Sequence, residues 1–503
     1  MTFSQVIPQA AHPAAVLAAG AVAVLVLELV LPAGRARRVC VPVAVVALAL
    51  AGLWAALGGE PGAQVPAEAQ SARSAAGLQV AQEVSVAGSS VTMDGIARWA
   101  YGVVTASGVA ALALAAPEVD RDEPAAFLAL LLLAACGMGL LASAQNLVVL
   151  FLGLELLSLS LYVMVAYRRD DRRAQEGALK YFLLGSFASG LLLMGIALVY
   201  GATGRFDFAG AGRLSGEAEQ GLVRLGMALV LAGVGFKLAL APFHLWAPDA
   251  YEGAGLGVAA FMSVATKASA LVALIRLAAS APGPSAEPLW ALAAASMLVG
   301  SLGALRQVDF RRLMAYSGIA NAGYLLIALP GLQALGIGAC AFYLTAYLFA
   351  NMGLFAVAAA VEQQQARTTG RRERLRLEGF DGLADRHPWL AWAGVLFLVS
   401  LTGLPLTGGF VGKFLLVQAA VAARHEWLAG VLVASTAILA YPYWKLAERM
   451  LRRAPLKPVP QAQRGSLPTE LGLAAAVCLA ATVALGVVPQ PLIRLATSWL
   501  GVF

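Results

Sequence analysis

Long apolar runs constrain this chain more than any other feature. Stretches of roughly 17–25 residues rich in Leu, Ala, Val and Gly recur along its 503 residues, and each matches a hydrocarbon core about 30 Å thick. Only 13% of the residues are charged, against about 25% in a typical soluble domain. The runs lack the alternation of a membrane barrel, so the backbone must satisfy its hydrogen bonds as helices. We predict an all-α polytopic membrane protein.

The connections between the runs predict the topology. Connections after odd-numbered spans, with the helix ends that face them, hold 23 Lys and Arg residues, whereas the opposite side and its helix ends hold eight. The positive-inside rule then places both termini outside, in the periplasm of a Gram-negative cell, with the chain crossing the inner membrane many times. The longest outer loop, residues 58–91, has no apolar period. The predicted spans are fourteen: 14–31, 39–57, 92–116, 125–142, 146–166, 178–200, 221–241, 256–277, 288–304, 313–329, 333–361, 390–417, 427–446 and 470–490.

Several classes of site are disfavoured. The net charge of +7 comes from Arg residues between apolar runs, which orient a membrane protein and do not indicate a nucleic-acid surface. The four cysteines lie far apart without CxxC spacing, so the sequence supports neither a zinc site nor an iron–sulfur cluster. The glycines of Gly253-Ala-Gly-Leu-Gly257 have the wrong context for a dinucleotide-binding turn. We expect no cofactor and no metal in this chain.

Lysine is used in an unusual way. The chain has 29 Arg and only six Lys, yet besides Lys445, in the last turn of the thirteenth span, four lie inside predicted spans: Lys180, Lys237, Lys267 and Lys413. A guanidinium keeps its proton in proteins, whereas a buried ammonium can release it. Anchoring charge alone would not favour Lys at these places, so we predict that the set carries protons. Snorkelling or static ion pairs are the alternative, more so for Lys180, which lies near a helix end.

Polar residues at helical spacing accompany these lysines. Glu155 is the matching acid in the fifth span, with Ser158 and Tyr162 on the same helix face. Similar stripes in the eighth, tenth and eleventh spans are Ser263 with Lys267, then Ser317, Asn321 and Tyr324, then Tyr343, Tyr347 and Asn351. One stripe could be interhelical hydrogen bonding, but four with the lysines predict a hydrated path through the bundle.

Two spans carry helix-breaking residues. The seventh runs into Ala241-Pro-Phe-His-Leu-Trp-Ala-Pro248, and the twelfth contains Thr402-Gly-Leu-Pro-Leu-Thr-Gly-Gly-Phe410. Irregular backbone at membrane depth is tolerated where it lines a cavity or is buried in protein. Lys237 precedes the first break and Lys413 follows the second, which is the relation that inverted repeats produce.

Long motifs around these residues resemble the antiporter-like subunits of respiratory complex I, and within them the subunit N branch of bacterial NADH-quinone oxidoreductase. The resemblance covers about residues 92–450. The matching runs are Phe151-Leu-Gly-Leu-Glu155-Leu-Leu-Ser, Leu179-Lys-Tyr-Phe-Leu-Leu-Gly-Ser186, Gly235-Phe-Lys-Leu, Pro242-Phe-His-Leu-Trp-Ala-Pro-Asp-Ala-Tyr-Glu-Gly253, Ser263-Val-Ala-Thr-Lys-Ala-Ser269, Arg312-Leu-Met-Ala-Tyr-Ser317, Leu377-Glu-Gly-Phe-Asp-Gly-Leu-Ala384 and Gly409-Phe-Val-Gly-Lys-Phe414.

The resemblance implies a single transmembrane domain with two inverted five-helix repeats, 125–277 and 288–446, after N-terminal helices over 14–116 and before a last helix at 470–490. It implies proton translocation driven by quinone reduction elsewhere. NADH, FMN, iron–sulfur clusters and quinone would belong to partner subunits, and the neighbours would be other antiporter-like and small membrane subunits. The implied proton relay is Glu155 paired with Lys237, His244 linking to Lys267 at the centre, Lys413 as the terminal lysine and Lys180 as a sixth-helix lysine.

Three positions depart from the family pattern. Gly255-Leu-Gly257 replaces the usual Pro-Thr-Pro, Leu406 replaces the second residue of a double proline, and Asn321 stands where many relatives have His. Asn cannot accept a proton at neutral pH, so a relay there requires water. The alternatives are a subunit of a multisubunit cation/proton antiporter or a membrane-bound hydrogenase, a standalone symporter, and a purely structural subunit.

Overall fold

The computed structural model describes residues 12–31, 33–57, 90–115, 124–208, 217–280, 287–327, 329, 334–369, 374–452 and 468–498. The described residues form helices joined by short connections, with only isolated β-bridges. The predicted outer loop 58–91 lies almost wholly outside the described residues. The α-helices are α2 (Pro13–Val30), α3 (Ala33–Leu57), α6 (Gly95–Leu114), α8 (Pro124–Ser143), α9 (Leu147–Val165), α10 (Arg172–Thr203), α11 (Glu217–Lys237), α12 (Trp246–Gly253), α13 (Leu256–Ser280), α14 (Glu287–Ala304), α15 (Phe310–Leu326), α16 (Ala334–Thr369), α17 (Leu383–Arg386), α18 (Pro388–Thr402), α19 (Gly408–Ala422), α20 (Glu426–Leu451), α21 (Thr469–Val487) and α22 (Gln490–Ser498).

Each predicted span coincides with a helix or a broken helix. Within the described ranges, 11 helices are long and apolar enough to cross a membrane, and α14, α18 and α19 are shorter apolar helices. If α18 and α19 together make one broken span, and α15 with its 17 residues makes another, the structure has the predicted fourteen. The all-α polytopic fold is therefore confirmed.

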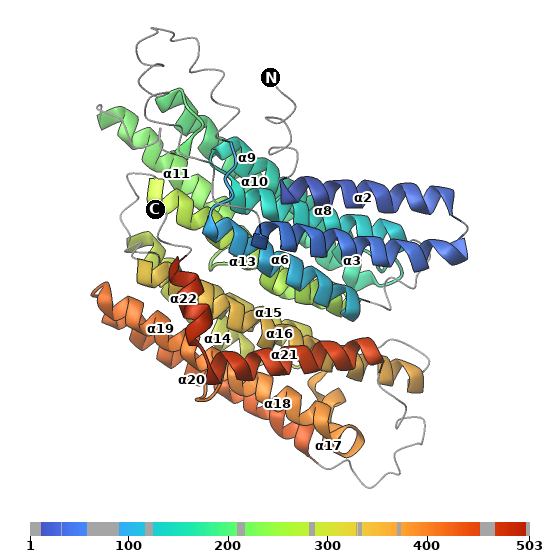
Figure 1. The fold of residues 1–503 in the computed structure, drawn as a ribbon. Helices are drawn as coiled ribbons and strands as arrows, with labels where there is room; N and C mark the ends of the chain where they lie inside the picture. The colour runs from blue at the N-terminus through green and yellow to red at the C-terminus, as the bar shows by residue number, and fades with distance from the viewer. Residues whose placement is uncertain are drawn as a thin grey trace.

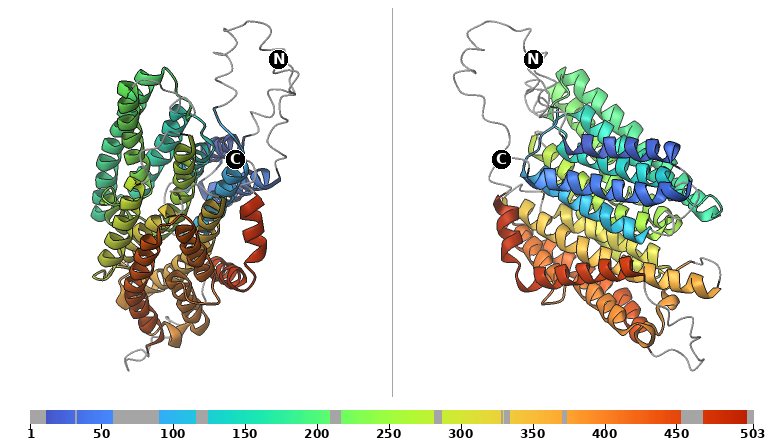
Figure 2. Two further views of the ribbon diagram at one scale, coloured as in Figure 1. Left: turned by 90° about the vertical axis from the view of Figure 1, so that its left-hand side faces the viewer. Right: turned by 45° about the vertical axis from the view of Figure 1, so that its right-hand side comes forward.

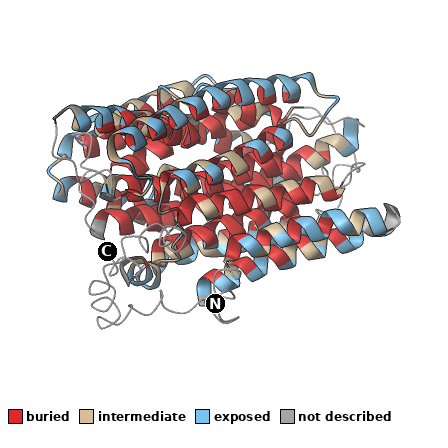
Figure 3. Ribbon diagram, turned by 90° about the horizontal axis from the view of Figure 1, so that it is seen from above, coloured by how far each residue is buried: buried red, intermediate tan, exposed pale blue. Residues whose placement is uncertain are grey.

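The helices gather in two lobes. Figure 1 shows α2 to α13 on one side and α14 to α22 on the other, with the spans roughly along one common axis. The turned views of Figure 2 keep the same separation. The spanning part of α13 is buried along its whole length and packs against α16, so these two helices lie where the lobes meet. Exposed residues gather on the outer helices (Figure 3). The division into two inverted repeats stays a prediction.

Bridges between connections show which connections lie at the same end of the bundle. Val91 bridges Ala144, and Asn146 bridges Asp207, which joins three connections after even-numbered spans. Asp309 bridges Arg376, which joins two connections after odd-numbered spans. The chain therefore alternates between the ends as predicted, and the end that carries the odd connections is called the basic end below.

Both predicted breaks are present. The seventh span ends as a helix at Lys237, four residues earlier than predicted, and Ala239 follows with φ +57°. The chain resumes as the short helix α12. In the twelfth span α18 ends at Thr402 and Gly403 follows with φ +82°; α19 begins at Gly408, two residues after Leu406, whose φ is +67°. These left-handed residues turn the chain where a continuous helix would otherwise run.

One connection is more helical than predicted. The eleventh span was expected to end at residue 361, but α16 continues to Thr369. The residues after Val361 are mostly good helix formers, and Glu362 pairs with Arg311 of α15, so nothing stops the helix before Gly370. A 3₁₀ turn (Leu377–Phe380) and α17 follow in the segment predicted as a loop.

Candidate functional site: a line of buried lysines

The first buried lysine, Lys237, ends α11 and is enclosed by α9 and α10. Its Nζ donates hydrogen bonds to Ser158 Oγ at 2.9 Å and to Tyr181 Oη at 2.7 Å. The ammonium also lies 4.9 Å from the centre of the Tyr181 ring and 5.7 Å from that of Tyr162. The side chain is 1% exposed, so these contacts replace its hydration shell.

Glu155, the predicted partner of Lys237, is held separately in this structure. Ser189 Oγ of α10 donates a hydrogen bond to Glu155 Oε1. Lys237 meets the same helix one turn away, at Ser158. The lysine and the carboxylate therefore share one face of α9, each with a hydroxyl partner of its own.

His244 lies in the break between α11 and α12 and is partly buried. Its Nδ1 is buried without a hydrogen-bond partner among the described residues. The hydrogen bonds of Lys237 and Lys267 to the described residues do not include it, so its predicted linking role stays a prediction.

The central lysine, Lys267, is buried in α13. Its Nζ donates to Ser263 O at 2.8 Å, one turn earlier in the same helix. Asn351 Nδ2 of α16 donates to Ser263 Oγ at 2.5 Å. Gly318 of α15 lies against the ammonium as well. A Cβ on Gly318 would lie 3.1 Å from Nζ, so a side chain there would crowd the lysine.

The polar stripe on α15 (Ser317, Asn321 and Tyr324) extends the polar contacts into the second lobe. Tyr343 of α16 donates a hydrogen bond to Asn321 Oδ1, and Asn321 Nδ2 donates to Ser317 Oγ at 3.2 Å. Ser317 Oγ lies 2.5 Å from the hydroxyl of Tyr443 on α20. The stripes of the eighth, tenth and eleventh spans thus contact one another, whereas that of the fifth span contacts Lys237. A hydrated path along them stays a prediction.

Lys413 of α19 meets the broken end of α18. Its Nζ donates to the carbonyls of Leu401 at 2.9 Å and Thr402 at 3.2 Å, and to Thr436 Oγ1 at 3.3 Å. Thr436 in turn donates to the hydroxyl of Tyr324 at 3.3 Å, and the Lys413 ammonium lies 5.1 Å from the Tyr324 ring centre. The terminal lysine and the α15 stripe are therefore in contact.

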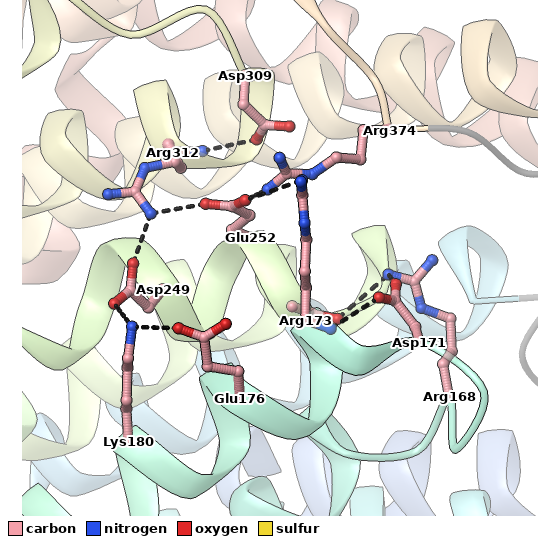
Figure 4. A network of polar contacts seen from close by, with 11 residues as sticks. Arg168, Asp171, Arg173, Glu176, Lys180, Asp249, Glu252, Asp309, Arg312 and Arg374 are labelled. Atoms are coloured by element: carbon pink, nitrogen blue, oxygen red, sulfur yellow. Dashed lines mark hydrogen bonds and ion pairs between the residues drawn. The ribbon is translucent and has the colours of Figure 1, made fainter.

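Lys180 differs from the other three. We expected a lysine inside the membrane bundle, but its side chain is 46% exposed and pairs with Glu176 at 2.6 Å and Asp249 at 2.8 Å. The expectation of burial is wrong because Lys180 lies on an exposed face of α10, with Glu176 one turn earlier on the same face. Figure 4 shows it at the edge of an ion-pair cluster at the basic end.

That cluster was not predicted. Arg312 of α15 contacts Asp249 at 2.5 Å and Glu252 at 2.6 Å, both on α12. Arg173 of α10 lies 3.6 Å from Glu252, and Arg374 also pairs with Glu252. Burial raises the pKa of Asp249, but hydrogen bonds from Lys180 and Arg312 outweigh it and hold the pKa below the usual value. The carboxylate therefore stays ionised at neutral pH.

Other partners of the lysines were also missed. Tyr181 and Thr436 each contact a buried lysine, and Ser189 contacts Glu155. For α10 a signal existed, because Tyr181, Gly185 and Ser189 recur every four residues and mark the face toward α9. Thr436 has no comparable pattern.

The chain resembles known proteins over most of its length. Residues 144–439 match the family described as NADH:quinone oxidoreductase/Mrp antiporter, transmembrane. The chain is 42% identical over 412 residues to NADH-quinone oxidoreductase subunit N 1 of Symbiobacterium thermophilum, covering 78% of this chain and 82% of the relative. It is similar to a chain of respiratory complex I from Thermus thermophilus, solved with bound aureothin, with a TM-score of 0.78, 33% identity, and coverage of 96% and 99%. A chain of the Mrp complex from Dietzia shares the fold with a TM-score of 0.78 at 22% identity, covering 97% of this chain and 96% of that one.

Proposed function

This chain belongs to the NADH:quinone oxidoreductase/Mrp antiporter transmembrane family, and on that premise we propose that it is the subunit N type of membrane-arm subunit of NADH:quinone oxidoreductase. It translocates protons and contains no redox centre. NADH, FMN, iron–sulfur clusters and quinone belong to partner subunits. Its neighbours are other antiporter-like and small membrane subunits. The identity to the Symbiobacterium and Thermus relatives supports this assignment over the Mrp-type antiporter, for which only the fold is shared.

One observation carries the proposal of a proton path. The buried arginines are paired with carboxylates: Arg276 with Asp94 at 2.7 Å and Arg311 with Glu362 at 2.6 Å. Lys237, Lys267 and Lys413 are equally buried, yet they bond only to hydroxyls and backbone carbonyls of the described residues. A buried charge without a counter-charge is costly, and an ammonium can avoid that cost by releasing its proton.

The mechanism begins at Glu155 and Lys237. Lys237 alternates between its hydroxyl partners and Glu155, one turn away on α9. Pairing with the carboxylate favours the ammonium, and separation favours release of the proton toward Lys267, with His244 as the link. Moving one charge through about 180 mV requires about 4 kcal/mol, which a change of about three pKa units in a carrier supplies.

The second half leads from Lys267 to Lys413. The proton passes the Gly318 contact and the stripe of Asn321 and Tyr324, where water must carry it past the amide. Lys413 then releases it at the far side. Lys180 serves as a sixth-helix relay at the entrance, where it is exposed.

The direct test replaces Lys237 by Arg, which keeps the charge but not the removable proton. The variant Lys237→Arg should assemble, and its proton translocation in reconstituted complex should fall to a small fraction of wild type. Lys445→Arg is the matched control, since Lys445 is exposed on α20. Wild-type pumping by Lys237→Arg would leave a static charge and refute the proposed relay.

The proposed orientation places both termini in the periplasm and the basic end in the cytoplasm of a bacterial inner membrane. Single cysteines at Arg205 and Thr369, in a cysteine-free background, should label from opposite faces. Mass spectrometry of the native assembly separates complex I from the antiporter and hydrogenase alternatives, because only complex I brings the NADH-oxidising flavin subunit.

A further inference from the structure

The short helix α12 begins in direct contact with the Lys237 site. Trp246, its first residue, donates from Nε1 to the carbonyl of Phe236 at 2.9 Å, the residue that precedes Lys237. Its ring stacks on Tyr181 with centroids 4.1 Å apart and planes 10° from parallel. Tyr181 is also the hydroxyl partner of the Lys237 ammonium. The position of α12 therefore sets the surroundings of Lys237.

The other contacts of α12 reach across to the second lobe. Asp249 and Glu252 lie three and six residues after Trp246, and both pair with one nitrogen of Arg312 on α15. Asp249 uses Oδ1 for Arg312 and Oδ2 for Lys180, so it joins α15 to α10 (Figure 4). We call Asp249, Glu252 and Arg312 the α12–α15 bridge.

The helix α15 leads from the bridge to the central lysine. Gly318, which faces the Lys267 ammonium, is six residues after Arg312 in one unbroken helix, a rise of about 9 Å. The neighbouring Arg311 pairs with Glu362 of α16 at 2.6 Å. Two consecutive arginines thus tie the start of α15 to two different helices, Arg312 to α12 and Arg311 to α16.

The packing around α12 leaves little room for independent movement. A Cβ on Gly253 would lie 2.8 Å from the carbonyl oxygen of Arg173, and a Cβ on Gly177 would lie 2.5 Å from that of Asp249. The backbones of α10 and α12 are therefore in direct contact. A displacement of α12 has to be shared with α10 or transmitted through Arg312 to α15.

We propose that the α12–α15 bridge is a positioning device that couples the Lys237 site to the Lys267 site. A change in the partner of Lys237 moves Tyr181 and Trp246. The bridge then carries that movement to α15 and alters the fit of Gly318 against Lys267. The inference rests on the proposed function, and its residues do not carry the proton themselves.

The test compares bridge variants in the whole complex, reconstituted in liposomes after native gels confirm assembly. Arg312→Gln and Asp249→Asn should each lower proton translocation and coupled quinone reduction at least about fivefold, the lower range of typical coupling between sites. Arg312→Lys should recover much of the loss, because it restores the charge. The double variant should be no worse than the more affected single one, because both remove the same bridge.

The matched control is Arg449→Gln. Arg449 pairs with Asp381 at 3.2 Å, and the two side chains are about as exposed as Arg312 and Asp249, but neither belongs to the bridge. Its rates should stay within twofold of wild type. Hydrogen exchange of peptides covering Leu238–Leu245 should rise in Arg312→Gln and not in the control.

Two outcomes would overturn the inference: wild-type rates in Arg312→Gln, or single losses that multiply in the double variant. Lys237→Arg measured alongside separates the two proposals. If Lys237→Arg is impaired while Arg312→Gln is normal, the relay stands and the bridge is only a surface cluster. If both are normal, the proposed relay itself fails.

Discussion

Removing one hydroxyl from the Lys237 site gives a quantitative test of the relay. Tyr181→Phe deletes the 2.7 Å hydrogen bond to Nζ but keeps the ring that stacks on Trp246 and faces the ammonium. A hydrogen bond to a charged group contributes about 1.5–3 kcal/mol, and Lys237 is only 1% exposed to bulk solvent that could replace it. The ammonium should become about 10–150-fold less populated relative to the neutral amine.

The assay follows from that shift. Proton translocation by Tyr181→Phe should fall about tenfold or more at pH 7.5, and part of the loss should return as the pH is lowered, because acid restores the ammonium. Tyr441→Phe is the control, since Tyr441 is exposed on α20 and its ring faces Lys445, outside the proposed path. A Tyr181→Phe complex with the rate and pH profile of wild type would show that Lys237 does not titrate during turnover.

The further predictions concern the backbone at Leu406 and the side chain that caps α15. Leu406 has φ +67°, which proline cannot adopt and which costs a non-glycine residue about 1–2 kcal/mol. Leu406→Pro should therefore lower the inactivation temperature of the complex, whereas Leu406→Gly should preserve or raise it. The reverse order would contradict the left-handed conformation. Asp309 caps α15 by accepting from the amide of Arg312 at 3.1 Å, so Asp309→Ala should be about 1 kcal/mol less stable than Asp309→Asn in thermal unfolding. Burial raises the pKa of Asp309, so its negative charge destabilises the fold above the folded-state pKa, and this cost fades as the pH falls. Asp309→Asn removes the charge, so it should be more stable than wild type at neutral pH, by a margin that shrinks in acid. A margin that grows in acid would refute the argument.

The sequence was sufficient for the spans and for the burial of three lysines. Run length determines where a helix can cross, and the reversal from Arg to Lys marked Lys237, Lys267 and Lys413, which are all buried. The same reasoning failed for Lys180, because the choice of Lys over Arg does not tell which face of its helix is exposed.

Contacts between distant segments could not be predicted in this way. Asp249 and Arg312 are 63 residues apart and belong to helices whose packing no local pattern specifies. The carbonyls that hold Lys413 are backbone groups, so they leave no trace in residue type. Both contacts arise from the broken helices, which place short segments where a continuous helix would have separated the partners.

In the proposed relay, the break in α18 would let Lys413 hold a proton without being locked to it. The last carbonyls of a helix carry a partial negative charge equivalent to about half an elementary charge, spread over several groups. Leu401 and Thr402 supply those carbonyls, so the Lys413 ammonium has a counter-charge weaker than a carboxylate. Arg276, bound by both oxygens of Asp94, shows the opposite case of a charge that is fully matched and fixed. A relay lysine needs both protonation states within reach, and the end of a half-helix supplies a field of that intermediate strength.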